Sequence, residues 1–342
     1  MDDRGQVRGR GRGAPHALQL IAFLAGCGTS TPAGRLLWVA ERGGVAQVWT
    51  ADADGADPRP LADLPGTAFP AAPDPLGTHA LLVTAEDDAR GHREQLWLAP
   101  LDGGTAAPFG PRTERIRNPA WSPDGRTVVF EADLESFRDI WAIGRDGTGL
   151  RRLTVTEHGS FEPSISATRL AFGTSRDGNA EIYAAAPDGS APVRLTDDVA
   201  DDVRPVWSPD GSRLAWISHR GGTARVWTMA PDGTDARPLR AAAEKAMDLD
   251  LAWAPDGGRL AVVVQTGARE VDIDLVDADG RVVARLGGPG VDEQPAWSPD
   301  GRWLVYAAAG ELVRVDRDGG GARPLTADPA PDWLPRWVGQ KQ

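Results

Sequence analysis

A short segment recurs along the chain and constrains its fold more than any other feature. Residues 291–303 read VDEQPAWSPDGRW, and related segments occur at Asn118–Arg126 (NPAWSPDGR), Arg204–Arg213 (RPVWSPDGSR) and, in a weaker form, Asp250–Arg259 (DLAWAPDGGR). Each copy is a short apolar strand ending in Trp, a tight turn and a second apolar strand. Ser-Pro-Asp-Gly suits a type I turn, because Pro presets φ, Asp accepts a backbone hydrogen bond and Gly tolerates the bend that follows. The segment therefore predicts repeated β-hairpins.

The repeat has a period of about 44 residues, a length that fits one four-stranded propeller blade. Period-two apolar spacing with β-branched or aromatic residues favours strands over helices. Seven units over residues 35–338 predict an all-β, seven-bladed β-propeller of four-stranded antiparallel blades, with six blades as the alternative. The residues that end the first strand of each unit are Ala72, Trp121, Ile165, Trp207, Trp253, Trp297 and Trp337.

The two ends of the repeat region complement each other. Residues 35–61 hold only the second, third and fourth strands of a unit, starting at Arg35–Val39. The missing first strand is found at Pro335–Val338. We therefore expect one blade to be built from both ends, so that the ring closes and no sheet edge stays open.

The repeat units resemble those of a known family. The pattern P-x-W-S-P-D-G-x-x-L-A-F, followed by an aromatic residue and D-G-x-x-x-R-L-T, resembles the TolB-type β-propeller repeat, and the likeness covers essentially all of residues 35–338. The resemblance implies a propeller fold within the wider group of exported TolB-like propellers. The same blade serves binding scaffolds, lyases and the gating domains of peptidases, so the resemblance leaves the function open.

The first 26 residues have the pattern of a bacterial lipoprotein signal peptide. Four arginines within residues 1–16 precede the apolar run Ala17–Gly26, which is too short for a permanent membrane span. The junction Leu24-Ala25-Gly26-Cys27 resembles a lipobox, in which the cysteine is lipidated and becomes the first mature residue; the alternative is a buried apolar segment with an incidental thiol. We expect a lipid anchor at Cys27, a tether at 27–34 and a single propeller domain at 35–342, located in the periplasm or on the outer surface of the cell envelope.

The charge of the chain argues against a nucleic-acid partner. The formal net charge is -12, and removal of residues 1–26 takes away four of the 37 basic and two of the 49 acidic residues, so that the charge falls to -14. No basic stripe exists outside the N-terminus, as a nucleic-acid binder would need. Cys27 is the only cysteine, which rules out an internal disulfide and a cysteine metal cluster. Membrane contact is expected only through the anchor.

Acidic residues gather in the connections from the fourth strand of one unit to the first strand of the next. In a four-stranded blade these connections and the second-to-third loops open on one face, and the two Pro/Asp-Gly turns open on the other. We expect the acids to surround one mouth of the central channel and to attract a basic peptide or protein partner. The alternative is that charged loops only confer solubility. The candidate partner-binding residues are Glu114, Glu157, Glu162, Asp201, Asp202, Asp248, Asp250, Asp292, Glu293 and Asp332.

Enzyme signatures are scarce. The chain has no Gly-x-Ser-x-Gly elbow, no His-Glu-x-x-His motif and no phosphate-binding glycine loop. His92, His158 and His219 fall in loops of like orientation, so the alternative function is a propeller lyase or hydrolase that acts on polysaccharide or peptide with loop acids, histidines and a divalent metal. Solvated loop histidines are the simpler interpretation. The prediction is a monomeric scaffold that binds a protein or peptide, with no catalytic residues, metal or cofactor.

Overall fold

The computed structural model describes residues 34–339, apart from residues 90, 136, 242–245, 289, 328 and 329. The predicted signal peptide (1–26), the lipidation site Cys27 and all but the last residue of the predicted tether lie outside the described residues. Within the described part of the chain, no helix is both long and apolar enough to cross a membrane.

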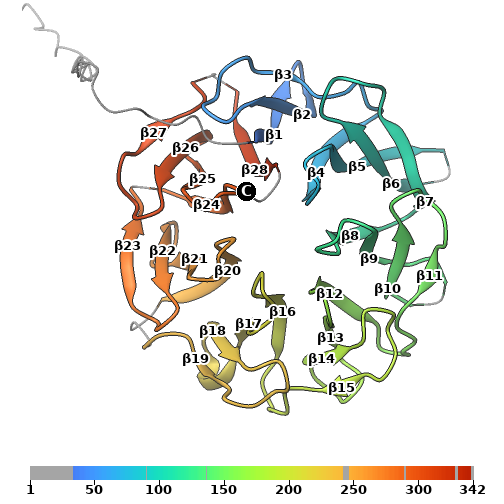
Figure 1. Ribbon diagram of the computed structural model, residues 1–342, viewed down its shortest axis with the longest axis vertical. Coiled ribbons are helices and arrows are strands. Elements are labelled where there is room, and N and C mark those ends of the chain that lie inside the picture. The colour runs from blue at the N-terminus through green and yellow to red at the C-terminus, as the bar shows by residue number, and fades with distance from the viewer. Residues whose placement is uncertain are drawn as a thin grey trace, which may run out of the picture. The chain divides into compact units, whose positions relative to one another are not determined.

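The described residues form 28 strands in seven four-stranded antiparallel sheets, and Figure 1 shows these sheets arranged as blades around a central axis. Blade 1 is β28-β1-β2-β3, and blades 2 to 7 follow in chain order from β4–β7 to β24–β27. The seven-bladed prediction is confirmed, and the six-bladed alternative is wrong. All blades belong to the unit Thr31–Gln342.

The strands occupy equivalent positions in every blade. The innermost strands are β4 (Thr67–Pro73), β8 (Ile116–Trp121), β12 (Ser160–Ile165), β16 (Asp202–Trp207), β20 (Met247–Trp253), β24 (Asp292–Trp297) and β28 (Asp332–Val338). The second strands are β1 (Arg35–Arg42), β5 (His79–Asp88), β9 (Thr127–Ala132), β13 (Leu170–Thr174), β17 (Leu214–Ser218), β21 (Arg259–Gln265) and β25 (Trp303–Ala308).

The outer half of each blade is less regular. The third strands are β2 (Val45–Asp52), β6 (Gly91–Pro100), β10 (Asp139–Gly144), β14 (Glu181–Ala185), β18 (Arg225–Met229), β22 (Val271–Asp277) and β26 (Glu311–Asp316). The fourth strands are β3 (Arg59–Pro60), β7 (Ala107–Thr113), β11 (Arg151–Arg152), β15 (Val193–Arg194), β19 (Arg237–Pro238), β23 (Val282–Leu286) and β27 (Arg323–Pro324). A short 3-10 helix, η1 (Arg220–Gly222), follows β17.

The ring closes as the sequence predicts. Strand β28 pairs antiparallel with β1, with Trp337 opposite Leu36 and Arg336 opposite Leu37. Trp337 is 3% exposed and Leu36 is fully buried. The last strand therefore completes the blade that begins the ring, and no inner edge of that blade is left open.

The Ser-Pro-Asp-Gly turns form by the hydrogen bonds expected of them. Ser122 Oγ donates to Asp124 at 2.6 Å and accepts the Thr127 N–H at 3.0 Å, while Gly125 N–H donates to the Ser122 carbonyl at 2.8 Å. In blade 2 the strand end differs from the expected Ala72: β4 ends one residue later, at Pro73, which pairs with Ala80 as Trp121 pairs with Val128 in blade 3.

The apolar core lies mainly between neighbouring blades. One cluster combines Leu37 and Val48 of blade 1 with Leu82 of blade 2, and another combines Phe109 of blade 2 with Trp121 of blade 3. Because each blade buries its faces against two others, closure of the ring determines how much apolar surface is buried in total.

Candidate functional site

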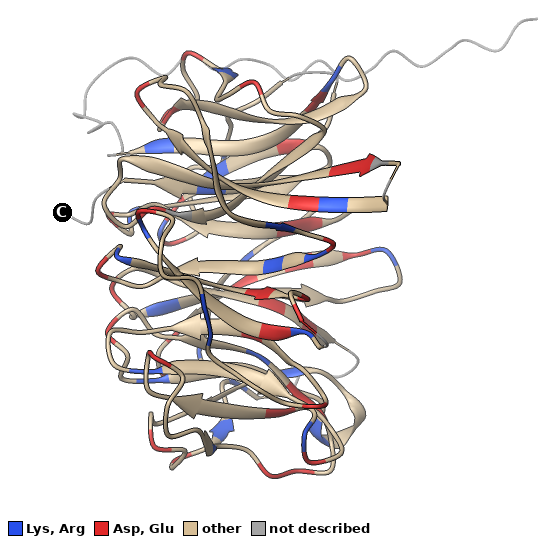
Figure 2. Ribbon diagram, turned by 90° about the vertical axis from the view of Figure 1, so that its right-hand side faces the viewer, with Lys and Arg blue, Asp and Glu red and all other residues tan. Residues whose placement is uncertain are grey.

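The propeller has two faces of different construction. The fourth-to-first connections and the second-to-third loops open on one face, which we call the loop face. The first-to-second and third-to-fourth turns open on the other, the turn face. In Figure 2 the turn face is at the left and the loop face is at the right. Acidic residues, in red, recur along the ribbon at the strand ends near the loop face.

A channel cavity of about 660 Å³ runs along the inner strands of blades 5, 6, 7 and 1. Its polar lining comes from Arg204, Asp250, Glu293, Gln294 and Arg336, interspersed with leucine and tryptophan side chains. Burial lowers the pKa of Arg336 against the opposing effect of Asp250. The channel wall thus combines both charge signs.

Residues in left-handed backbone conformation position this lining. Glu162, Arg204, Gln294 and Leu334 each precede a proline in an inner strand and have φ between 51° and 59°. The Arg204 N–H donates to Glu162 Oε2 at 2.7 Å, and the Leu334 N–H donates to Gln294 Oε1 at 2.7 Å. Equivalent residues are therefore linked between blades 4 and 5 and between blades 7 and 1.

Three of the ten predicted partner-binding acids are buried and paired within the propeller. Asp202 is fully buried 2.8 Å from Arg220, and Asp248 is buried 2.9 Å from Arg240. Asp332 is buried, accepts a hydrogen bond from Trp38 Nε1 at 3.0 Å and lies 3.5 Å from Arg42. The structure does not present these carboxylates to a partner, because each is buried against an arginine of the propeller.

A fourth predicted acid, Asp292, is buried differently. Its side chain is 8% exposed, and Oδ2 accepts the Gly288 N–H at 3.1 Å. It makes no ion pair with any residue that the structure describes. Burial raises the pKa of Asp292, and the nearby charge of Asp272 raises it further.

The remaining six predicted acids are exposed or half-buried on the loop face and the channel wall. Glu114 lies 3.2 Å from Arg93, and Arg204 lies between Glu162 at 3.7 Å and Asp250 at 3.3 Å. Burial raises the pKa of Glu162 despite its contacts with Arg204. Three predicted acids form no ion pair among the described residues: Glu157, Asp201 and Glu293.

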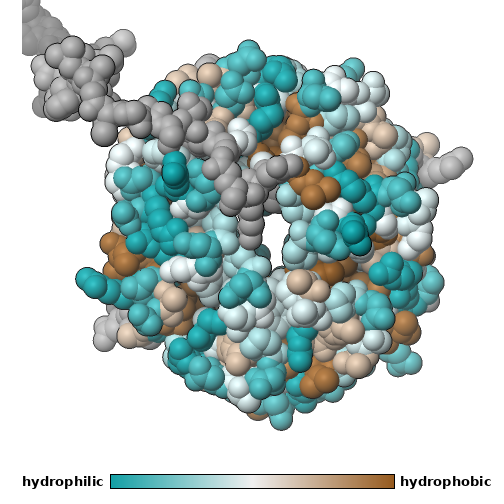
Figure 3. Space-filling model, in the orientation of Figure 1, coloured by the Kyte–Doolittle hydropathy of each residue, from teal (hydrophilic) through white to brown (hydrophobic). Residues whose placement is uncertain are grey.

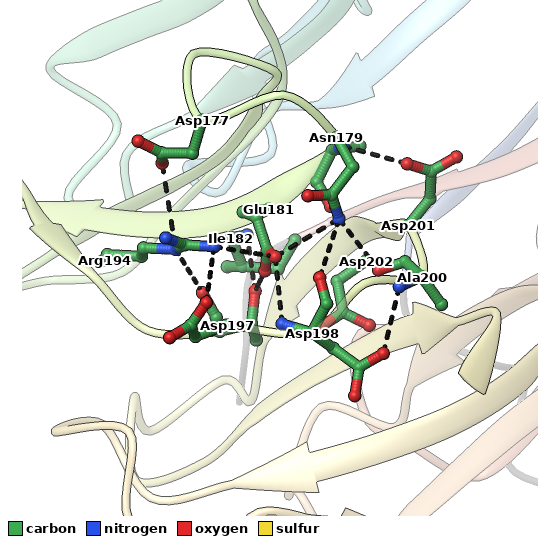
Figure 4. Close-up of polar contacts among 12 residues, drawn as sticks. Asp177, Asn179, Glu181, Ile182, Arg194, Asp197, Asp198, Ala200, Asp201 and Asp202 are labelled. Carbon is green, nitrogen blue, oxygen red and sulfur yellow. Dashed lines mark hydrogen bonds and ion pairs between the residues drawn. The ribbon is translucent and has the colours of Figure 1, made fainter.

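Several buried acids on third strands were not predicted from the sequence. Figure 4 shows the fully buried Glu181, which lies 2.9 Å from Arg194 and accepts the Asp198 N–H at 3.0 Å. Thr196 Oγ1 donates to the same carboxylate and accepts the Ile182 N–H at 2.8 Å. The sequence signal for this network is the acid at the start of the third strand together with the Leu-Thr pair that ends the unit.

The three loop histidines are not brought together. His92 lies between Asp87 at 3.0 Å and Glu94 at 3.2 Å, and hydrogen bonds to these carboxylates raise its pKa. His219 Nδ1 is 3.2 Å from the Asp201 carbonyl, and His158 is exposed on another blade. Among the residues that the structure describes, no group of three or more His, Cys, Asp or Glu side chains could hold a metal ion.

The turn-face mouth of the channel is apolar. A cavity of about 670 Å³ there is lined by Trp121, Trp207, Trp297 and Trp337, together with the prolines of the first-to-second turns. Figure 3 views this face and shows the central opening. The tryptophans are 3–8% exposed, because they pack between blades, as expected from the repeat.

Comparison with known proteins identifies the relatives of this architecture. The family model of the TolB beta propeller domain matches residues 160–338. The Tol-Pal system protein TolB of Anaeromyxobacter dehalogenans strain 2CP-C is 30% identical over 134 residues, which are 38% of this chain and 30% of that protein. The chain thus matches less than a third of that relative's length.

Solved structures share the fold at low sequence identity. The crystal structure of TolB from Acinetobacter baumannii aligns with a TM-score of 0.59 and 20% identity, covering 89% of this chain and 66% of that one. An oligogalacturonate lyase in complex with manganese aligns with a TM-score of 0.62 and 15% identity, covering 86% of this chain and 85% of that one. Likeness at this level extends to the fold and not to the chemistry of any site.

Proposed function

The chain belongs to the TolB β-propeller family, and from this premise we propose that it is a scaffold of the bacterial cell envelope that binds a basic peptide or protein segment on its loop face. Export, lipidation at Cys27 and a monomeric state are parts of the same proposal. The scaffold is either periplasmic or on the outer surface.

The observation that carries the proposal is the set of acids on the loop face without an internal counter-charge. Glu157, Asp201 and Glu293 come from three different blades and have no ion-pair partner among the described residues. Most other acids of this face are neutralised by arginine within the propeller. Unpaired carboxylates at a channel mouth attract cationic segments and accelerate their association.

Two further observations agree with this proposal. The channel cavity offers both leucine and tryptophan surface and polar groups, the mixture that peptide-binding clefts use for affinity and orientation. A relative is named as a protein of the Tol-Pal system, which supports a role in association with other proteins.

Site-specific photo-crosslinking in whole cells tests the proposal. We would place a photoreactive residue at Glu157 on the loop face and, as a control, at the exposed Asp279 on the turn face. The expected result is one defined protein adduct from position 157, lost in high salt, and no adduct at that mass from position 279. Equal labelling from both positions, or none from 157, would refute the loop face as the partner-binding surface.

A further inference from the structure

Blades 1 and 5 contain the same three-residue arrangement on the loop face. In blade 5 the Arg220 guanidinium lies 2.8 Å from Asp202 and 4.6 Å from the ring centroid of Trp227. In blade 1 Arg42 lies 3.5 Å from Asp332 and 4.3 Å from the ring centroid of Trp49. Each arginine therefore lies over an aromatic ring of the third strand and neutralises the aspartate that begins the inner strand.

The strand register shows that blade 7 has the same framework. Asp292 pairs with Ala308 in blade 7, just as Asp202 pairs with Ser218 in blade 5. Two residues before these partners, the second strand carries Tyr306 in blade 7 and Trp216 in blade 5. The acid and the second-strand aromatic residue are thus retained in blade 7.

The arginine and the third-strand ring are absent from blade 7. Arg220 follows Trp216 by four residues, and the position four residues after Tyr306 is Gly310. The residue paired with Tyr306 is Val313, where blade 5 has Trp227. A two-residue turn joins β25 to β26 with φ of 50° at Ala309 and 87° at Gly310, and a backbone of this kind disfavours a side chain such as arginine at the glycine.

The loss of the arginine leaves Asp292 without a counter-charge. Each of the other buried carboxylates among the described residues forms an ion pair with at least one arginine. Asp292 is 8% exposed, compared with 0% for Asp202 and 1% for Asp332, so its carboxylate retains access to solvent.

Tyr306 provides a second unsatisfied group at the same position. Its side chain is only 7% exposed, and its hydroxyl forms no hydrogen bond with the part of the chain that the structure describes. Its pKa is raised by burial and by the charge of Asp292, which lies close to it. A hydroxyl without a hydrogen-bond partner thus lies near a carboxylate without a cation, and we call the position beside them, where blades 1 and 5 hold an arginine, the slot.

We propose that this slot, bounded by Asp292, Tyr306 and Val313, binds the guanidinium group of an arginine side chain from a partner, in place of the arginine that blades 1 and 5 supply from their own chain. The proposal rests on the proposed function and assigns a specific subsite within it. A guanidinium is favoured over an ammonium because its planar donors can reach the carboxylate and the tyrosine oxygen together.

Titration of the full-length protein with N-acetyl-arginine amide, followed by NMR, tests the slot directly. We expect saturable binding to the wild-type protein, at least tenfold weaker binding to Asp292→Asn, and at least fivefold weaker binding of N-acetyl-lysine amide. The matched control Asp279→Asn removes one exposed acid from the turn face and should change the affinity less than twofold. Tyr306→Phe, which keeps the ring, should weaken binding two- to fivefold.

Three results would overturn the slot: no saturable binding to the wild-type protein, equal binding to Asp292→Asn, or an equal loss of affinity in Asp279→Asn. The spectrum of each free variant shows whether it is folded, so a loss of binding is not confused with unfolding. Repeating the crosslinking experiment with Asp292→Asn separates the two proposals. If the affinity for N-acetyl-arginine amide is the same with and without Asp292 while the loop-face adduct persists, the slot is wrong and the proposed function stands.

Discussion

Asp74 and Asp292 are both buried carboxylates, but their surroundings give them opposite effects on stability. Burial alone would raise the pKa of Asp74, yet Arg145, at 2.8 Å from each of its oxygens, and the backbone N–H groups of Leu76 and Thr78 hold that pKa well below its usual range. Asp292 has one backbone donor and an acidic neighbour, so its pKa is raised. The surroundings of Asp74 stabilise its ionised form, whereas those of Asp292 destabilise its ionised form.

Asp74→Ala should lower the free energy of unfolding at pH 7 by about 3 kcal/mol, because it leaves Arg145 without its buried partner. A folded-state pKa below the unfolded value means that this contribution is complete above the unfolded pKa, about 3.9, and is lost as the pH falls below it. Chemical denaturation from pH 7 to pH 2 should show the difference between wild type and variant shrinking below about pH 4. A difference that stays constant over this range would contradict the role of the charge.

Asp292→Asn should leave the free energy of unfolding at pH 7 unchanged or raise it by up to about 1 kcal/mol, because it removes an unpaired buried charge. The raised folded-state pKa means that wild-type stability falls as the pH rises from the unfolded pKa through the folded one, and this dependence should disappear in the variant. Asp248→Asn, which disrupts a buried pair with Arg240, is the control and should lower stability by about 2 kcal/mol. A comparable decrease in the free energy of unfolding in both variants would show that the ionised form of Asp292 stabilises the fold.

Single residues also show where sequence reasoning fails. The recurrence of Asp202, Asp248, Asp292 and Asp332 at the start of inner strands is visible in the sequence. Their burial is not, because the side chains that cover them come from other strands and loops. The four-residue spacing from Trp38 to Arg42 and from Trp216 to Arg220 was an available signal, and its absence in blade 7 marks the slot.

At the scale of elements, the third-to-fourth turns connect neighbouring blades. A Cβ atom at Gly189 of blade 4 would lie 2.3 Å from the Leu153 carbonyl oxygen of blade 3, whereas one at Gly103 of blade 2 would meet nothing within 4 Å. Both glycines have a positive φ, 86° and 96° respectively. The turn glycine is therefore required in blade 4 for two reasons, the backbone conformation and the contact between blades.

Gly189→Ala should lower the free energy of unfolding by about 1–3 kcal/mol more than Gly103→Ala, because only the former adds a steric clash to the shared cost of a positive φ. Urea denaturation of both variants measures this difference. Equal destabilisation would mean that the backbone conformation alone explains the glycine.

The whole ring could be predicted from the sequence, whereas most of the site could not. The period and the turn chemistry are local features that predicted the blade count, and the incomplete units at the two ends of the repeat predicted the pairing of β28 with β1. The channel lining and the ion pairs arise between blades, where no spacing rule links Arg204 to Asp250 or Arg240 to Asp248. Pro73 shows the limit for strand ends: blade 2 lacks the tryptophan that marks this position in most other blades, and the expected end, Ala72, was wrong by one residue.

Deletion of residues 333–342 should destabilise the entire ring, because it removes most of β28 and exposes the inner edge of β1. We expect a melting temperature lowered by about 10 °C or more, or failure to fold. Calorimetry of the truncated protein is the measurement. Melting within a degree or two of the intact chain would mean that the pairing of the two ends contributes little.

The central claim, that the loop face binds a basic partner, is tested most directly by two variants of equal net charge. Glu157→Gln/Asp201→Asn/Glu293→Gln alters the loop face, and Asp54→Asn/Asp102→Asn/Asp279→Asn alters the turn face. With a fluorescent peptide of alternating alanine and arginine, we expect the loop-face variant to bind about tenfold more weakly at low salt, with a reduced salt dependence. The turn-face variant should bind within twofold of wild type. An equal loss in both variants, or no loss in the loop-face variant, would contradict the claim.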